Sequence, residues 1–359
     1  MRIHILSQPH TQLTAEYNRC AYTSKVIKLC KMLTKEGIKV CVYGGDENET
    51  PAELVTCITK EELSEYGFNS PDDYLKNDFN SKSPLWVTFH KNCTSKLQER
   101  IEPGDFIGTF SGIADKPIKD AFPQNRFIEL GIGYAGSFAD FRVFESYAWQ
   151  NHTYGTYNMD GRFYDTVIPN YFDPDEFPEG EPKDYYLFVG RMITRKGLQI
   201  IDDMARRMPN ERFILAGQGG MVEGNRVYYD GGYLEGDNLE YIGVIDSNQR
   251  SDLMSHAKAL ICPTLYVGPF EGVHVEAMMA GTPVLTTPFG CFTETYIHGI
   301  HGFKCHTIKE FIEGAHKDYD RKEIRKYAQS RYSMDVVAKQ YIKYFELLKG
   351  LDNGGFYEK

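Results

Sequence analysis

The chain has 359 residues, and because single hydrophobic cores stop growing at about 250 residues, we expect it to fold as two domains. Its composition, with 42% hydrophobic and 25% charged residues, is that of an ordinary globular protein and excludes a disordered or fibrous chain. Fifty acidic residues against forty basic ones give a formal net charge of −10, which argues against nucleic acid as a partner.

The N-terminal sequence MRIHILSQPH contains an apolar run that is too short for a signal peptide, and no later window approaches the ~20 apolar residues of a membrane-spanning helix. We therefore expect a cytoplasmic protein, with peripheral contact to a membrane surface left open. The eight cysteines contain no CxxC pair, so we expect buried free thiols in preference to a zinc site or a disulfide framework. Nothing in the sequence specifies an oligomeric state.

Short β-branched or aromatic runs alternate with helical patterns in the first 168 residues, which is typical of parallel βαβ units. A helix is predicted over 15–36, where apolar residues from Val26 to Leu33 recur on one face and Gly37 supplies the stop. Strands are predicted at 2–7, 39–45, 85–90, 105–110, 126–130 and 143–148.

Prolines 169, 174, 178 and 182 interrupt any regular element, so we place a linker there. The alternation then restarts, with a helix over Leu198 to Met208, a closing amphipathic helix over 333–350, and strands at 185–190, 212–217, 239–244, 258–264 and 282–288. The predicted fold class is α/β, with one doubly wound, Rossmann-like domain in residues 1–168 and a second in 169–332.

The segment FVGRMITRKG (188–197) has the pattern of a strand that ends at Gly190, followed by Arg191 and, at the start of a helix, Lys196. Because the carboxyl ends of parallel strands face the ligand crevice in such sheets, we expect both cations to point into it. Fixed cations and backbone N–H donors stabilise a diphosphate that develops charge as it leaves. The alternative is a pair of solvated charges at a helix start.

A second segment, CPTLYVGPFEGVHVEAMMAGTPVLTTPFGCFTET (262–295), breaks a strand at Pro263 and enters a helix near Gly272. Free N–H groups at a helix start suit a phosphate. Glu276 lies about one turn into this helix, where its carboxylate can accept hydrogen bonds from both hydroxyls of a ribose. A lone helical glutamate is more often solvated, but this one lies in an otherwise apolar stretch.

The two segments together resemble the family 4, or group 1, retaining glycosyltransferases of the GT-B fold. The family's loop E-P-F-G-x-V-x-x-E-A-M, followed by G-T-P-V, aligns without gaps with GPFEGVHVEAMMAGTPV (268–284). Family motifs cover the sequence well from 185 to 305. Before residue 165, only the pattern of alternating strands and helices resembles the family. It implies two facing Rossmann-like domains with a cleft between them, and a C-terminal helix (333–359) that joins the N-terminal, acceptor-side domain.

The resemblance further implies a retaining hexosyltransferase that needs no cofactor and moves a sugar from a UDP- or GDP-sugar to a hydroxyl of a sugar-containing acceptor, which can be a glycan, lipid-linked or a small molecule. It places Arg191 and Lys196 on the donor diphosphate and Glu276 on the ribose. The other donor-binding positions that it implies are Gly190, Gly217, Val244 near the base, and Phe270, Gly272 and Val273 in a run of main-chain amides.

Two positions depart from the family pattern. Gly268 stands where the family has the first glutamate of its E-x7-E motif, and Glu271 stands where the family has a glycine. Either Glu271 takes over contact with the donor sugar's hydroxyls, which makes it a candidate catalytic residue, or donor chemistry is lost and a nucleotide-sugar-binding protein remains. A sugar phosphorylase shares the fold and is a third alternative.

The first strand-to-helix loop, SQPHTQLTAEYN (7–18), lacks the paired glycines common in the family, and its polar residues, His10 among them, suggest different acceptor contacts. His90 is the other acceptor-side candidate, with a satisfied structural histidine as the alternative. The DPD triplet at 173–175 lies in the proline-rich linker and predicts a turn, so we expect no metal requirement.

Overall fold

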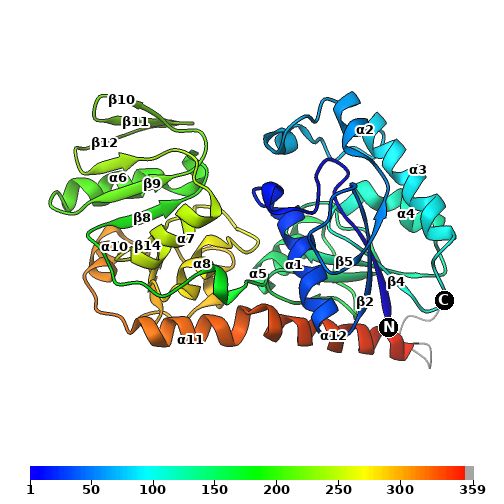
Figure 1. The fold of residues 1–359 in the computed structure, drawn as a ribbon. Helices are drawn as coiled ribbons and strands as arrows, with labels where there is room; N and C mark the ends of the chain where they lie inside the picture. Colours follow the sequence, from blue (N-terminus) through cyan, green and yellow to red (C-terminus); the bar gives the residue numbers. More distant parts are fainter. Residues whose placement is uncertain (352–359) are drawn as a thin grey trace. The chain divides into compact units, whose positions relative to one another are not determined.

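The structure, a computed structural model, describes residues 1–351 of the chain (Figure 1). These residues form two compact units, each of mixed α/β structure around a parallel sheet. Unit 1 contains residues 1–145, 153–171 and the described chain from Val337 on, and unit 2 contains residues 146–152 and 172–336. Residues 352–359 of the predicted closing segment lie outside the described residues.

Unit 1 is built on a seven-stranded parallel sheet with the order β3-β2-β1-β4-β5-β6-β7. Its strands are β1 (Arg2–Leu6), β2 (Lys39–Gly44), β3 (Glu53–Thr56), β4 (Phe106–Thr109), β5 (Arg126–Ile132), β6 (Phe141–Phe144) and β7 (Thr166–Val167). The strand order changes direction between β1 and β4. In a doubly wound sheet, ligands bind outside the carboxyl ends of the two strands at such a switch point.

The helices of unit 1 follow its strands in the βαβ manner (Figure 1). They are α1 (Ala21–Lys35), α2 (Lys60–Glu65), α3 (Pro84–Gln98), α4 (Lys116–Ala121), the second part of α5 (Tyr147–Thr156), and most of α12 (Met334–Gly350). The predicted helix over 15–36 is confirmed only from Ala21, because a separate single turn occupies Ala15–Tyr17.

One strand predicted in this half is wrong, and a second is right only in its first two residues. Residues 85–90 belong to the helix α3, in which Pro84 takes the first position, where its missing N–H costs nothing. The buried side chains of α3 recur at Leu85, Phe89 and Cys93, a helical spacing that a six-residue window is too short to reveal. The strand predicted at 143–148 ends at Phe144, and its second half opens α5.

Unit 2 is built on a six-stranded parallel sheet with the order β13-β9-β8-β14-β15-β16. Its strands are β8 (Tyr186–Val189), β9 (Phe213–Ala216), β13 (Leu239–Tyr241), β14 (Leu260–Cys262), β15 (Val284–Thr286) and β16 (Gly302–Lys304). Its helices are α6 (Leu198–Arg207), α7 (Ser247–His256), α8 (Val273–Met279), α9 (Phe292–Thr295), α10 (Ile308–Ala315) and α11 (Arg321–Tyr332). The five strands predicted for this half are present, each shortened at one or both ends. The sixth strand, β16, was not predicted.

A small antiparallel sheet that the sequence analysis missed is inserted between β9 and β13. It consists of β10 (Met221–Glu223), β11 (Arg226–Tyr229) and β12 (Gly232–Glu235). Thr194 joins it to the loop after β8, because both its amide and its hydroxyl donate to the Asp230 carbonyl, at 3.1 and 2.6 Å. These hydrogen bonds therefore hold the loop after β8, which lies at the carboxyl edge of the main sheet.

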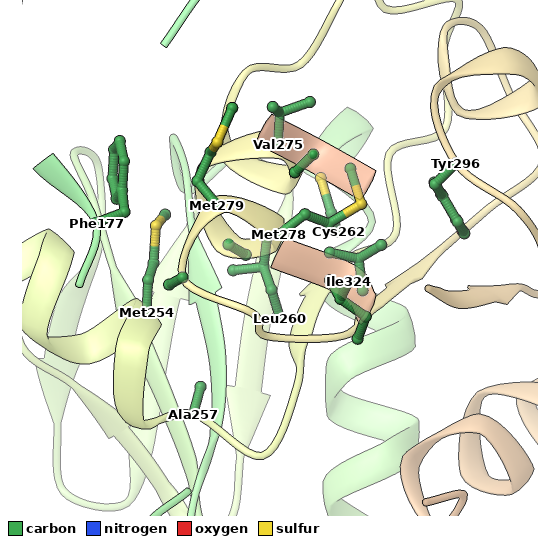
Figure 2. Close-up of a cluster of buried hydrophobic side chains, with 14 of the residues drawn as sticks. Phe177, Met254, Ala257, Leu260, Cys262, Val275, Met278, Met279, Tyr296 and Ile324 are labelled. Atoms are coloured by element: carbon green, nitrogen blue, oxygen red, sulfur yellow. The ribbon is translucent and has the colours of Figure 1, made fainter. Parts of the chain in front are cut away.

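One core cluster of unit 2 lies beneath the helix α8, in which Val275, Ala277, Met278 and Met279 are fully buried. Figure 2 shows Val275, Met278 and Met279 of this helix among the side chains of Cys262 and Ile324. This packing fixes the helix on the sheet and therefore fixes the loop that leads into it.

Three further expectations can be compared with the structure. All eight cysteines are free and buried, as predicted. The DPD triplet forms a turn, in which the Asp173 carboxylate accepts from the Asp175 amide at 3.0 Å. Within residues 1–351, no helix is both long enough and apolar enough to span a bilayer.

Candidate active site

The switch point of the unit 2 sheet lies between β8 and β14, because the chain winds outward in opposite directions from these two neighbouring strands. Ligands of doubly wound sheets bind outside the carboxyl ends of such strands. Two loops occupy that edge, Gly190–Gly197 after β8 and Pro263–Gly272 after β14. They hold the two motifs that the sequence analysis selected.

These two loops are joined to each other. The Leu265 amide donates to the Arg195 carbonyl at 2.9 Å. Gly197 has φ of +78°, and a Cβ there would lie 2.0 Å from the Pro263 carbonyl oxygen, so no other residue fits without moving the loop.

The glycine strand ends predicted to bind the donor meet at the same edge. Gly217, after β9, has φ of +142°, and a Cβ there would lie 1.8 Å from the Gly190 carbonyl oxygen. Its amide donates to the Gly243 carbonyl at 2.8 Å, and Val244, which follows, is exposed. The ends of β8, β9 and β13 therefore form one surface on which a ligand can lie close to the backbone.

Arg191 follows Gly190 directly, and its guanidinium is exposed. It makes no ion pair or hydrogen bond within the part of the chain that the structure describes. An uncommitted cation at the carboxyl edge of a parallel sheet is suited to binding a phosphate group.

Lys196, in contrast to Arg191, forms an ion pair. Its ammonium forms an ion pair with the carboxylate of Glu271, and both side chains are largely buried. Burial alone would lower the pKa of Lys196, but the Glu271 charge outweighs it and raises the pKa above its usual value, so the ammonium stays protonated. The Tyr266 hydroxyl donates to the same carboxylate, and the Arg195 guanidinium lies 4.4 Å from the centre of the Tyr266 ring. The sequence analysis missed Tyr266 and Arg195.

Four successive main-chain amides, those of Phe270, Glu271, Gly272 and Val273, donate no hydrogen bond within residues 1–351. The Phe270 ring is buried against Phe172, so only its backbone is open to a ligand. Open N–H groups beside cations form a receptor for an anion, because each amide regains the hydrogen bond that it lost on leaving water.

Glu276 lies in α8 and is only 8% exposed. Its Oε2 lies 3.5 Å from Nε of Arg250, a residue of α7 that the sequence analysis missed. Both atoms are buried without a hydrogen-bond partner in the described chain. A buried carboxylate that accepts too few hydrogen bonds is costly unless a ligand supplies donors, as the hydroxyls of a ribose would.

Residues 171–330 match the model of the family described as glycosyl transferases group 1. We refer to this segment as the group 1 domain, after the family model that it matches. The prediction of that family from the 188–197 and 262–295 motifs is thereby confirmed, and the group 1 domain contains every site residue of unit 2 described above.

Individual curated proteins also resemble part of the chain. An uncharacterized glycosyltransferase of Methanocaldococcus jannaschii is 25% identical over 185 residues, which are 45% of this chain and 44% of that protein. The chain spans about half the length of the curated relatives that it matches.

Two solved structures resemble the whole chain. The glycosyltransferase AviGT4 of avilamycin A biosynthesis has a TM-score of 0.70 at 17% identity, over 99% of both chains. Alr3699/HepE of Anabaena, solved with UDP-glucose, has a TM-score of 0.64 at 15% identity, over 97% of this chain and all of that one. These likenesses confirm the predicted GT-B fold.

The acceptor-side candidates lie in unit 1, outside the group 1 domain. His10 is buried in the loop after β1, against the rings of Phe68 and Phe79, and burial lowers its pKa to about 3. His90 forms a hydrogen bond with the Asp115 carboxylate at 3.0 Å and packs in the core. This arrangement fits the alternative of a structural histidine that contacts no ligand.

The loop after β1 has an unusual concentration of buried polar groups. It lies at the switch point of unit 1, and the Gln8 amide donates to the Ser111 hydroxyl at 3.0 Å, which links it to the loop after β4. Five of its side-chain atoms are buried without a hydrogen-bond partner in the described residues: Ser7 Oγ, Gln8 Oε1, His10 Nδ1, Gln12 Nε2 and Thr14 Oγ1. These groups are mostly neutral, unlike the cations of the group 1 domain.

Proposed function

We propose that the protein is a glycosyltransferase that moves a sugar from a UDP- or GDP-sugar to a hydroxyl of a sugar-containing acceptor, with retention of anomeric configuration and as a member of family 4. The observation that supports it most is the cluster at the switch point of the group 1 domain: the exposed Arg191, four open amides, and the buried, under-bonded Glu276. The UDP-glucose complex of a structural neighbour supports the same class of donor.

In this mechanism, Arg191 and the amides of Phe270 to Val273 bind the donor diphosphate, and Glu276 accepts hydrogen bonds from the ribose. The bond between the anomeric carbon and the diphosphate oxygen breaks while the acceptor oxygen bonds to the same face of that carbon. The acceptor proton passes to the departing diphosphate oxygen, so no separate base is needed. The fixed positive groups stabilise the negative charge that develops on the diphosphate.

In this proposal, the acceptor binds to unit 1. The five unpartnered polar atoms in the loop after β1 support a neutral ligand with several hydroxyls, because hydroxyls both donate and accept hydrogen bonds. His10 stays uncharged at neutral pH, which suits such a ligand. His90 stays a weaker acceptor-side candidate, since its bond to Asp115 already occupies Nε2.

A cytoplasmic location and independence of metal and cofactor complete the proposal. Metal independence is tested by adding EDTA to a transfer assay, where we expect unchanged turnover. Loss of transfer on chelation, restored by manganese, would contradict it.

A nucleotide-sugar-binding protein without transferase activity is the second candidate. Gly268 and the Lys196–Glu271 ion pair favour it, because the pair reduces the net positive charge available to a leaving diphosphate. A sugar phosphorylase, the third alternative, would depend on free phosphate instead of a nucleotide.

The experiment that separates these functions is a transfer assay with labelled UDP-glucose and GDP-mannose and a mixture of sugar acceptors, with and without inorganic phosphate. We expect nucleotide release and labelled product without added phosphate. Arg191→Ala should lower the rate about a hundredfold, as loss of one charge-stabilising contact does. Arg207→Ala is the matched control. Arg207 is exposed at the C-terminal end of α6, away from the loop that holds Arg191, and it pairs with Asp203. Binding without release or transfer would instead support the binding protein.

A further inference from the structure

The antiparallel insertion β10–β12 is firmly anchored in unit 2. Val227 and Leu234, which pair across β11 and β12, are buried in the same core cluster as Met192 of the loop after β8. The Glu235 amide at the end of β12 donates to the Asp202 carboxylate of α6 at 2.9 Å. The insertion is therefore a fixed part of the domain and can support a neighbouring loop.

The two-residue turn between β11 and β12, residues 230–231, contacts the loop after β8. In addition to the two hydrogen bonds from Thr194 to the Asp230 carbonyl, the Asp230 amide donates to the Met192 carbonyl at 3.3 Å. Gly231 has φ of +102°, and a Cβ there would lie 1.9 Å from the Thr194 hydroxyl oxygen. Glycine at position 231 therefore allows the turn to approach the loop this closely.

Arg191 has no side-chain contact that fixes it. Its guanidinium is exposed and unpaired within the described residues, so its own backbone sets its position. The next residue, Met192, is held on two sides, because its amide donates to the Gln218 carbonyl at 2.7 Å and its carbonyl accepts from Asp230. The Ile193 amide closes a tight turn by donating to the Arg191 carbonyl at 3.0 Å. A displacement of the 230–231 turn would therefore reach Arg191 through Met192.

Lys196, later in the same loop, is held in a different way. Its ammonium is fixed by the ion pair with Glu271, and the backbone beside it by the hydrogen bond from Leu265 to Arg195. Of the two cations of this loop, Arg191 is thus the one whose placement depends on the insertion. Placement matters, because a misplacement of about 1 Å in a binding group can cost about a hundredfold in rate.

We propose that the turn 230–231 is a positioning element of the donor site. Asp230 holds Met192 and Thr194 through its backbone groups, Gly231 permits the close approach, and together they place Arg191 for contact with the donor diphosphate. This inference rests on the proposed function, since it assigns the support of the same donor site. The two turn residues act through Arg191 and are not themselves ligand contacts.

The test measures the Kd for UDP and GDP by calorimetry on the full chain. Gly231→Ala should weaken binding of the nucleotide about 10-fold, because a displaced Arg191 loses a charged hydrogen bond to the diphosphate. Thr194→Val should weaken it about 3-fold, because the hydroxyl bond to Asp230 is lost while the backbone bonds remain. Thr194→Ser keeps that hydroxyl and should bind as the wild type does.

A double-variant cycle separates positioning from a general loss of structure. In an Arg191→Ala background, Gly231→Ala should change the Kd by less than about 2-fold, because the residue through which it acts is gone. A merely structural effect would weaken binding by the same factor with and without Arg191.

Gly224→Ala is the matched control. Gly224 lies in the turn between β10 and β11 and also has a positive φ, +62°, but a Cβ there would meet no atom within 4 Å. The variant adds the same methyl group to the other turn of the same insertion, so it should leave the Kd unchanged. Thermal unfolding checks that each variant folds.

Three results would overturn the inference. The first is an unchanged Kd in a folded Gly231→Ala variant or, if that variant does not fold, in Thr194→Val. The second is equal weakening with and without Arg191, and the third is the same weakening in Gly224→Ala. Failure of the wild-type chain to bind either nucleotide would instead refute the proposed function, and the role of the turn with it.

Discussion

The buried ion pair of Lys196 and Glu271 gives a sharp prediction on stability. The side chains are 14% and 6% exposed, so replacing Lys196 by Met leaves a carboxylate largely removed from water without its cation. Removing one partner of a buried pair costs about 3–5 kcal/mol, and the remaining Tyr266 hydrogen bond places this case near the lower value. In a domain of roughly 150–250 residues, ~3 kcal/mol lowers the melting temperature by about 6–12 °C.

The assay is thermal unfolding of four proteins: the wild type, Lys196→Met, Glu271→Met and the double variant. The double variant should regain most of the lost stability, because two apolar side chains of similar volume need no partner. Its donor binding should stay impaired, since the carboxylate is gone. A Lys196→Met melting temperature within about 2 °C of the wild type, or a double variant no more stable than the single ones, would refute the ion pair as described.

Three further predictions concern single residues. Glu276→Gln should weaken nucleotide binding about 10-fold or more in calorimetry, because one charged acceptor is lost from the ribose, and an unchanged affinity would remove Glu276 from the site. His274 has a folded pKa of about 4, below the ~6.5 of an unfolded histidine, so its contribution to stability is fully present above pH 6.5 and falls as the pH drops toward 4. Urea unfolding at several pH values should therefore show a decline of up to ~1.4 kcal/mol per pH unit from His274, and His274→Asn should reduce it; an equal slope in both proteins would contradict the assignment. Asp165→Asn breaks the buried, two-bonded contact with Arg142 in unit 1 and should destabilise that unit by about 3 kcal/mol while nucleotide affinity is unchanged; impaired affinity would contradict the placement of the donor site in the group 1 domain alone.

Five of the six strands in the main sheet of unit 2 were predictable, because they are short apolar runs followed by glycine or proline. The 188–197 motif located β8 and the cations after it for the same reason. The antiparallel insertion from β10 to β12 was missed, because Val227 and Leu234 are the only buried side chains of its three strands, which leaves no apolar run. The failure at 85–90 was different, since Leu85, Trp86 and Phe89 pack as one face of α3, whereas Val87, which suggested a strand, is exposed.

The residues of the proposed donor site that the sequence predicted include those whose proposed role needs only a position at a strand end, such as Gly190, Arg191 and Gly217. The residues that were missed act through side-chain contacts that form only when the loop or the domain has folded. Tyr266 and Arg250 have no local signal, because their partners, Glu271 and Glu276, are reached only in the folded domain. The departure at Gly268 was visible in the sequence, but the occupation of its space by Glu271 required the structure.

The central claim is that the group 1 domain binds a nucleotide sugar through Arg191, the open amides and Glu276. A thermal-shift screen of the wild type and Arg191→Ala against UDP-, GDP- and ADP-sugars tests it most directly, because a ligand that binds only the folded state raises the melting temperature. We predict that one class of nucleotide sugar stabilises the wild type by about 2.7 kcal/mol at a hundred times its Kd, and that Arg191→Ala loses most of this shift. No shift with any of these donors, or an equal shift in both proteins, would contradict the account.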